Sequence, residues 1–109
     1  MSTHPSEAEI QAEVLRVLGA RPDLRLWRAN TGAAIDPSTG RLIRFGVPGQ
    51  ADLSGILAGG RRLEIEIKSA RGRQTPHQQF FGAMIVRFGG LYIVAHSLQD
   101  ALAAIEEVL

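Results

Sequence analysis

The segment at residues 63–68 most constrains this chain, because its six residues alternate strictly between apolar and charged side chains. A period of two predicts a β-strand with three aliphatic side chains on one face and two carboxylates and an ammonium on the other. Such a pattern alone is typical of a half-exposed strand with a solvated face. Lys68 indicates a role beyond that of a solvated surface residue, because it is the single lysine among 12 basic side chains. A lysine at this position, where every other base is arginine, indicates a need for a compact, flexible ammonium.

The apolar segment at residues 51–57 predicts the partner of this strand, since two glycines lie in the connection between them. A three-residue loop at 58–60 would place Asp52 directly across from Glu66, with Cβ atoms ~4.5–5.5 Å apart. Two facing carboxylates repel and raise each other's pKa unless a cation lies between them. Lys68 is one candidate for that cation, and a hard divalent metal such as Mg²⁺ is the other.

The same register fixes the remaining positions of this hairpin. Ser54 faces Glu64, which shares the acidic face but lies two residues from Glu66 and is expected only to flank the site. The apolar side chains of both strands share the opposite face: Leu53, Leu57, Leu63, Ile65 and Ile67. A slip of one residue would separate them, so the hydrophobic pattern supports the register.

Length and composition bound the class of protein. A chain of 109 residues predicts one domain, spanning 1–109, with a core of modest size. Cysteine is absent, which excludes disulfides, thiolate catalysis and cysteine–zinc sites and suits a cytoplasmic protein. No apolar run approaches the ~20 residues of a membrane span, and residues 1–5 do not begin a signal peptide, so we expect no membrane association. The three histidines lack metal-ligand spacing.

Charge is distributed unevenly along the chain. All 12 basic residues lie between Arg16 and Arg87 with only five acids among them, whereas residues 1–15 and 88–109 hold six acids and no base. A basic middle segment with embedded carboxylates favours a polyanionic partner, although ordinary surface arginine is the simpler explanation.

Residues 6–19 are predicted to form the first helix. Ser6 and Glu9 have the spacing of a capping box, and the apolar positions recur at helical intervals. Glu7 falls on the inward face of this helix at its first turn. It is either an acid that favours the helix dipole or a supporting residue of the site, and the sequence leaves both open.

A second helix is predicted from Pro76 to about Phe88. Thr75 would be its N-cap and Gln78 would close a capping box. Gln78 also lies at the edge of the apolar face, so it caps the helix, reaches the site, or does both. The predicted inward side chains of this helix are Phe81, Met84, Ile85 and Phe88.

The remaining elements complete an α-β-(β)-β-β-α-β-α order. We expect a strand at 24–30 anchored by Trp27, and a small hairpin formed by Ile35 and residues 41–45. A buried strand follows at 91–95. A last helix begins after Ser97, with inward side chains Leu98, Leu102, Ile105 and Val108. This order predicts an α/β fold with a mixed central sheet flanked by helices.

Asp52, Glu66 and Lys68, with Glu7 nearby, have the chemistry of a metal-dependent hydrolytic site. Carboxylates hold Mg²⁺, which stabilises charge on a phosphoryl oxygen, and a lysine orients water or steadies that charge. Arginines along the middle of the chain are candidates for holding phosphates. These arginines are Arg28, Arg41, Arg44, Arg61, Arg62, Arg71 and Arg73.

The sequence also resembles the VRR-Nuc branch of the PD-(D/E)xK nuclease superfamily over nearly its whole length. The matching stretches are Glu7-x-x-Ile10-Gln11, Arg28-x-Asn30-Thr31-Gly32, Gly46-x-Pro48-Gly49-Gln50-Ala51-Asp52, Glu66-x-Lys68 and Gly72-Arg73-Gln74-Thr75-Pro76-x-Gln78. One departure is Ala51, where many relatives have proline. The motifs occur in the family's order, which is more specific than any one of them.

This resemblance implies a restriction-endonuclease-like αβββαβ core with an extra C-terminal helix, and a phosphodiesterase that uses Mg²⁺ or Mn²⁺. It implies that Asp52, Glu66 and the Ile67 carbonyl bind the metal. Lys68 would be the catalytic lysine, with Gln78 and Glu7 as supporting residues. The positions expected to contact DNA are Arg28, Asn30, Arg44, Arg71 and Arg73.

Short members of this branch resemble phage or prophage proteins that act as dimers on branched DNA such as four-way (Holliday) junctions. The implied setting is therefore the cytoplasm of a bacterial or phage-infected cell. One site per chain and two strands to cut also favour a twofold dimer. Two alternatives stay open: a non-catalytic DNA-binding or assembly module with the same fold, and a partner-docking domain with a solvated strand face.

Overall fold

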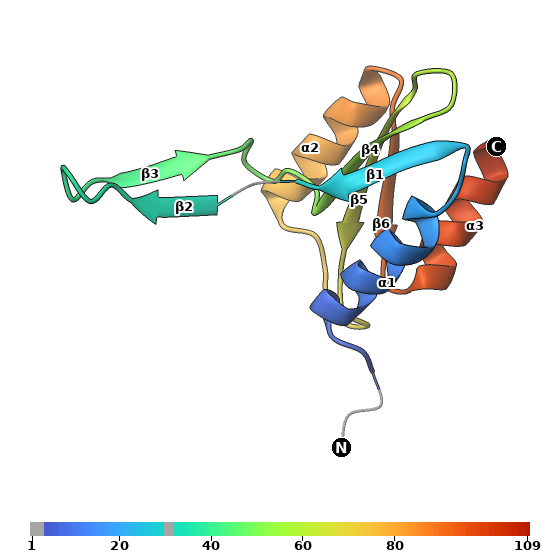
Figure 1. Cartoon of the computed structure of the whole chain (residues 1–109), viewed down its shortest axis with the longest axis horizontal. Coiled ribbons are helices and arrows are strands. Elements are labelled where there is room, and N and C mark those ends of the chain that lie inside the picture. Colours follow the sequence, from blue (N-terminus) through green and yellow to red (C-terminus); the bar gives the residue numbers. More distant parts are fainter. Residues whose placement is uncertain (1–3, 30–31) are drawn as a thin grey trace.

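The computed structural model describes residues 4–29 and 32–109. In chain order its elements are α1 (Glu7–Gly19), β1 (Leu24–Arg28), β2 (Gly32–Ile35), β3 (Leu42–Phe45), β4 (Leu53–Leu57), β5 (Arg62–Ile67), α2 (Pro76–Arg87), β6 (Leu91–Ala95) and α3 (Leu98–Val108). Each expected helix and strand is present, including the small hairpin β2–β3 (Figure 1). The capping boxes predicted for α1 and α2 both form.

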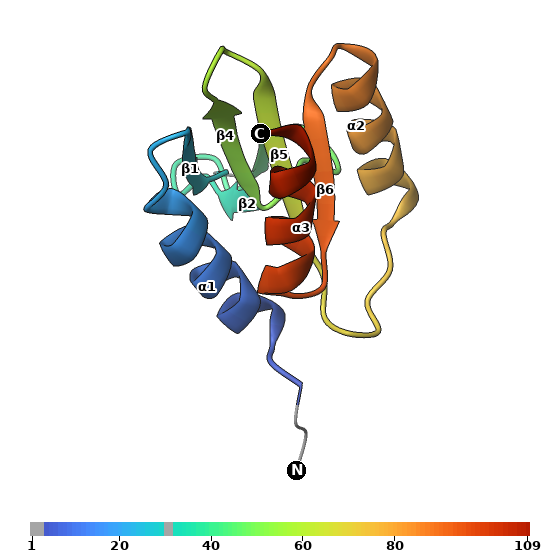
Figure 2. The same ribbon diagram turned by 90° about the vertical axis from the view of Figure 1, so that its right-hand side faces the viewer.

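The central sheet has the strand order β1-β4-β5-β6. β1, β4 and β5 are antiparallel neighbours, and β6 joins β5 in parallel after the crossover through α2. Helices α1 and α3 cover one face and α2 covers the other (Figure 2). This is the expected mixed sheet flanked by helices, with α3 added after the αβββαβ core.

The main core lies between the sheet and the α1/α3 layer. The least exposed large apolar side chains are Val14, Leu18, Leu53, Leu63, Ile65, Ile67 and Ile105. The hydrophobic pattern of the β4–β5 hairpin predicted its share of this core correctly. Burial of each such side chain contributes ~1.5–3 kcal/mol, so this face supplies most of the hydrophobic stabilisation.

The opposite face holds a much smaller core under α2. Phe81 and Ile85 pack there with Ala51, and Tyr92 lies against them. Met84 is 39% exposed and Phe88 79% exposed, so their expected inward orientation is wrong. The physical reason is that α2 packs mainly over β5 and β6, so one side of the helix borders an open part of the sheet.

Trp27 does not anchor β1 as expected. Half of its surface is exposed, whereas Leu24 is buried in the main core. Trp27 pairs with Ser54 on the face of the sheet that α2 covers only in part, and β1 is an edge strand. Val108, expected inward on α3, is likewise 39% exposed at the end of that helix.

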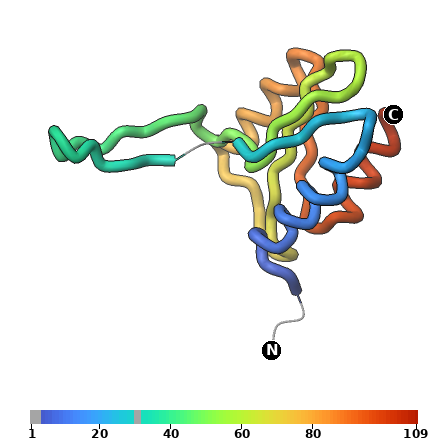
Figure 3. The backbone as a smooth tube through the Cα atoms, in the orientation of Figure 1, coloured from blue at the N-terminus to red at the C-terminus, as the bar shows by residue number. Residues whose placement is uncertain are grey.

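The β2–β3 hairpin forms a two-stranded sheet of its own. It projects from the rest of the molecule as an arm (Figure 3), and all eight of its strand residues are exposed. Asp36 stabilises the turn at its tip, since its Oδ1 accepts hydrogen bonds from the Ser38 backbone N–H at 2.9 Å and from the Ser38 hydroxyl at 2.8 Å. We refer to residues 32–45 as the arm.

No helix within the described residues combines the length and apolar character needed to cross a membrane.

The close approach of β1 and β4 generates a stability prediction. A methyl group at Gly55 would collide with the backbone oxygen of Arg25. We expect Gly55→Ala to lower the free energy of unfolding by about 1–3 kcal/mol, measured by urea denaturation. Gly19→Ala is the matched control, because nothing lies within 4 Å of the added carbon. Equal stability of the two variants would contradict this account of the sheet.

Candidate active site

The register of the β4–β5 hairpin places the site as the sequence predicted. Leu53 pairs with Ile65 and Ser54 with Glu64, and the Leu57 N–H donates to the Arg61 carbonyl across a three-residue loop. Continuing the register by one residue brings Asp52 opposite Glu66. Beyond the last backbone-paired residues, the side chain of Asp52 accepts the next hydrogen bond from β5.

Asp52 is fixed by a backbone hydrogen bond from β5. Its Oδ2 accepts from the Ile67 N–H at 2.8 Å, and its own carbonyl accepts from the Ala29 N–H at 2.9 Å. The N–H and C=O of one antiparallel strand residue project to the same side, so the Ile67 carbonyl also faces toward β4. The hairpin thus brings one carboxylate and one backbone carbonyl to the same edge of β5.

Glu66 is almost completely buried, with 3% of its surface exposed. Its Oε2 accepts a hydrogen bond from Gln78 Nε2 at 2.9 Å and lies 3.6 Å from Lys68 Nζ. Its Oε1 is buried and has no hydrogen-bond partner among the described residues. A buried carboxylate oxygen left unpaired is costly, and it indicates a site built for an additional positive group.

The electrostatics of Glu66 agree with this geometry. Burial, and after it the negative charge of Asp52, raise the pKa of Glu66 to about 7 despite the opposing effect of Lys68. The single ammonium therefore does not neutralise the pair. Of the two cations that the sequence left open, Lys68 is present but is insufficient alone.

Gln78 performs both of the roles considered for it. Its Oε1 accepts from the Thr75 N–H at 2.8 Å, which closes the capping box of α2. Its Nε2 donates to Glu66. An amide side chain has one acceptor and one donor end, so the two roles use opposite ends of the same group.

Tyr92 supports this arrangement from β6, a role that no motif in the sequence indicated. Gln74 Nε2 donates to the Tyr92 hydroxyl at 2.9 Å, and that hydroxyl donates to the Gln78 carbonyl at 3.5 Å. Burial raises the pKa of Tyr92 to about 12, which keeps it a donor. Tyr92 contacts α2 closely at Gly82, and a side chain there would strike its ring. The one signal that could have found it is a polar aromatic residue in an otherwise aliphatic strand.

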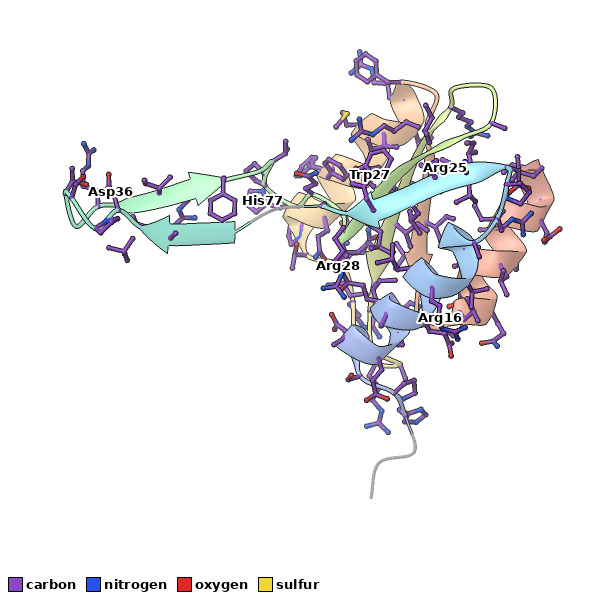
Figure 4. All side chains as sticks on the ribbon, viewed as in Figure 1. Arg16, Arg25, Trp27, Arg28, Asp36 and His77 are labelled. Atoms are coloured by element: carbon purple, nitrogen blue, oxygen red, sulfur yellow. The ribbon has the colours of Figure 1, made fainter. Side chains whose placement is uncertain are left out.

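A cavity of about 590 Å³ opens over the two carboxylates. Its walls are Asp52, Glu66, the base of the arm (Ala33, Arg44, Phe45), the loop at 46–50 and the first turn of α2 (Thr75, His77, Gln78). His77 lies at this end of α2 beside the arm (Figure 4). The spacing of His77 in the sequence suits no metal site, and only the fold brings it to the cavity.

Gly49 allows the loop at 46–50 to lie against α2. Its φ of +76° is in the left-handed region, and a side chain would collide with the His77 carbonyl. The glycine thereby brings the wall of the cavity close to the helix that carries Gln78.

Glu64 does not face solvent, as the half-exposed strand pattern would have placed it. Its side chain is fully buried beneath α2, where Arg62 Nη2 lies 3.6 Å from its Oε1. Both oxygens lack a hydrogen-bond partner among the described residues, and burial raises the pKa of this carboxyl. The solvated-face interpretation fails for Glu64, Glu66 and Lys68, all buried, because α2 covers β5.

The other predicted site residues are more dispersed. Glu7 lies in the first turn of α1 but is exposed, so its expected inward orientation is wrong. Arg28, at the end of β1, is exposed, and Asn30 lies outside the described residues. Arg71 and Arg73 line a separate hollow with His96, whose Nε2 is 3.2 Å from the Gly72 oxygen. Of the expected DNA contacts, Arg44 lines the cavity above the carboxylates.

The residues present fit a divalent cation held by two carboxylates. Within the described residues, no group of three or more histidine, aspartate or glutamate side chains is arranged as metal ligands. A cation at this site would therefore rely on Asp52, Glu66 and non-side-chain oxygens such as the Ile67 carbonyl. The unpaired Glu66 Oε1 is the observation that supports this fit.

Comparison with solved structures finds a known domain that shares this fold. A structure described as "VRR_NUC domain" superposes with a TM-score of 0.66, covering 96% of this chain and 100% of that chain at 19% sequence identity. This chain therefore has the fold of a VRR_NUC domain, as its motifs implied. No protein-family model matches the sequence, and no curated protein matches it.

The raised pKa of Glu66 predicts how stability depends on pH without metal. Between pH about 4.5 and about 7 the folded chain holds a proton on Glu66 that the unfolded chain has lost, so this group lowers stability as pH rises. We expect metal-free Glu66→Gln to match the wild type at pH 4 and to be more stable at pH 8 by about 1–3 kcal/mol. The measurement is urea denaturation in EDTA at both pH values.

Glu107→Gln, which changes an exposed glutamate on α3, is the matched control for this substitution. A Glu66→Gln variant that is no more stable than the wild type at pH 8 would contradict the claim that ionised Glu66 beside Asp52 destabilises the folded chain.

Proposed function

We propose that this chain is a metal-dependent DNA endonuclease of the VRR-Nuc type that hydrolyses phosphodiester bonds. The observation that carries the proposal is the buried Glu66 carboxylate, with one unpaired oxygen, beside Asp52 and Lys68. The VRR_NUC fold supports the same conclusion. A domain that only docks proteins has no use for a buried carboxylate held beside a second carboxylate and an ammonium under an open cavity.

Asp52 and Glu66 would hold Mg²⁺ or Mn²⁺ together with the Ile67 carbonyl. When bound, the metal supplies Lewis-acid stabilisation of charge on a phosphoryl oxygen. The chain holds both carboxylates in place before binding. Asp52 is oriented by the Ile67 N–H and Glu66 by Gln78, so little reorganisation is needed.

Lys68 is the candidate catalytic cation. Its side chain is only 11% exposed, and Nζ lies 3.6 Å from Glu66 Oε2. In this partly dry location an ammonium acts more strongly on a negative charge than it would in water. We assign it to orienting the attacking water or steadying charge that develops on the phosphoryl oxygen. Gln78 positions Glu66 and does not itself need to contact DNA.

Four exposed arginines are the candidates for holding the flanking phosphates. Arg44 lines the cavity, Arg28 is exposed at the end of β1, and Arg71 and Arg73 are exposed on the loop between β5 and α2. Asn30 and Glu7 complete the proposed set of contacting or supporting residues. We propose branched DNA, such as four-way junctions, as the substrate and a homodimer as the active form, since two strands require two sites.

Metal binding is predicted to stabilise the folded protein through the two carboxylates. At a concentration of Mg²⁺ or Mn²⁺ near 100 times Kd, the gain is about 2.7 kcal/mol and is measured as a rise in Tm. Asp52→Asn and Glu66→Gln should abolish most of this rise, whereas Glu107→Gln should retain it. An equal rise in all four proteins would show that the metal binds elsewhere.

Cleavage is predicted to require Lys68 as well as metal. We expect Lys68→Ala to lower the rate by at least ~100-fold, because a charge aimed at the transition state is lost. Lys68→Arg should rescue poorly, since the planar fork differs from a compact ammonium. The assay compares four-way junction, flap, linear duplex and single strand with Mg²⁺, and Arg16→Ala on the exposed face of α1 is the control.

A folded wild type that cleaves none of these DNAs with Mg²⁺ or Mn²⁺ would overturn the proposal. Salt-dependent binding without turnover would then support the non-catalytic DNA-binding alternative. Cleavage of linear duplex and junctions at equal rates would retain the nuclease and reject its structure selectivity.

A further inference from the structure

The only tryptophan of the chain lies at the open edge of the central sheet. Trp27 is on β1, which is an edge strand, and half of its surface is exposed. It lies on β1 between Arg25 and Arg28 (Figure 4). A tryptophan in this position forgoes much of the stabilisation that burying a large aromatic ring provides, so its exposure needs an explanation.

The hydrophobic core does not account for Trp27, which is part of neither apolar cluster. Trp27 pairs across the sheet with Ser54, and the same row of side chains continues inward through Glu64 and Tyr92. Because these neighbours are polar, no apolar layer extends outward to the indole. Among the described residues, no other aromatic ring and no cation stacks on it. One face of the ring is therefore available to a ligand.

The indole lies close to the candidate active site. Trp27 pairs with Ser54, and two residues further along β1 the Ala29 N–H donates to the Asp52 carbonyl at 2.9 Å. Trp27 and Asp52 are therefore diagonal neighbours across β1 and β4. The Cβ atoms of such a pair are ~7–8 Å apart, which is within reach of an aromatic side chain. A ligand on the indole would thus lie beside the carboxylates that we assign to the metal.

The side chains around Trp27 favour a polyanionic ligand. Arg25 shares its face of β1 and Arg28 follows it at the strand end, and both are exposed. Arg25 donates a hydrogen bond to the Leu24 carbonyl at 2.8 Å, which leaves further guanidinium N–H donors for phosphate oxygens. Ile56, 42% exposed, pairs with Arg25 and adds apolar surface next to the ring. An exposed aromatic face with arginines beside it is typical of a surface that binds single-stranded nucleic acid.

We propose that Trp27 is a stacking platform for an unpaired base of the DNA substrate, with Arg25 and Arg28 on the adjoining phosphates. This inference rests on the proposed function and specifies which feature of branched DNA the chain selects. In a paired duplex each base is stacked between its neighbours and offers no free face to the indole. At a branch point, a bulge or a single-stranded end, a base can leave the stack and lie on the ring.

An unpaired base suits this surface better than a docking protein does. A tryptophan that dominates a protein interface is usually surrounded by contacts that exclude water from it. Trp27 lacks such surroundings, because Arg25 and Arg28 flank it on β1 and this strand carries no acidic residue. Cations in this arrangement are better suited to phosphates. The neighbouring carboxylate site, which acts on phosphodiesters under the proposed function, also selects DNA as the occupant.

The first test uses the fluorescence of Trp27, which no other tryptophan obscures. Wild type in EDTA and Lys68→Ala in Mg²⁺ are titrated with a single strand, a duplex carrying an unpaired base, and a fully paired duplex. Anisotropy of labelled DNA follows binding in parallel. Stacking on a base quenches indole emission, so we expect quenching by the first two DNAs and little by bound paired duplex. Equal quenching by all three DNAs would overturn the proposal, as would a bound single strand that leaves the emission unchanged.

The second test replaces the ring. Trp27→Ile keeps an apolar side chain of high β-propensity but removes the aromatic face, whereas Trp27→Phe retains one. We expect Trp27→Ile to weaken binding of DNA with an unpaired base by about 5- to 100-fold, the contribution of one stacked base, and to leave binding of paired duplex unchanged. Trp27→Phe should restore most of the affinity. Phe88→Leu, which changes another exposed aromatic residue at the end of α2, is the control and should bind like the wild type.

The outcomes separate this inference from the proposed function. Trp27→Ile should cleave saturating DNA at the wild-type rate, because the platform binds substrate without taking part in the chemistry. A protein that cleaves DNA but binds it equally well as wild type and as Trp27→Ile would overturn the platform alone. Equal loss of paired and unpaired DNA, with a lower urea midpoint, would assign Trp27 to stability instead. A protein that binds none of the DNAs would overturn both proposals and leave this surface to a protein partner.

Discussion

The rest of the structure depends on one unfavourable contact, the burial of the Glu66 carboxylate next to Asp52. Removing a carboxylate from water is costly, and a second negative charge nearby adds to the cost. The fold opposes this with the Ile67 N–H on Asp52 and with Gln78 and Lys68 on Glu66. These groups still leave one buried oxygen unpaired and the pKa of Glu66 at about 7. The site therefore has fewer positive charges than its two carboxylates require. The hydrophobic register of β4 and β5 fixes Asp52 opposite Glu66, so the two carboxylates cannot move apart.

Helix α2 couples the formation of the site to the formation of the fold. Gln78 is at once the residue that closes the capping box and the residue that holds Glu66, so the first turn of α2 and the carboxylate site form together. Tyr92 strengthens this link from β6, and Gly49 lets the cavity wall reach the same turn. Because α2 covers only part of its face of the sheet, it buries the charged row of β5 while leaving a groove open beside it. The cavity and the uncovered apolar surfaces thus have a common origin.

The two faces of the sheet have different roles: the face under α1 and α3 provides the apolar core, and the face under α2 carries the charged residues of the candidate site. The α1/α3 face carries nearly all of the large buried aliphatic side chains, and it tolerates changes that conserve volume and pattern. The α2 face carries Glu64, Glu66 and Lys68, whose burial lowers stability and has no packing purpose of its own. A fold match at 19% identity is consistent with this division, because an apolar face constrains residue class more than residue identity.

The sequence alone determined the order of the elements, the capping boxes and the β4–β5 register, because each follows from local periodicity or from side chains a few residues apart. The register in turn places Asp52 opposite Glu66. Only the tertiary structure decided that Trp27 and Phe88 are exposed and that Glu64 is buried, since these depend on how far α2 extends over the sheet. His77 and Tyr92 likewise join the site through contacts between distant segments. Burial is a property of the neighbours a residue acquires on folding, and a periodic pattern predicts its face but not what covers that face.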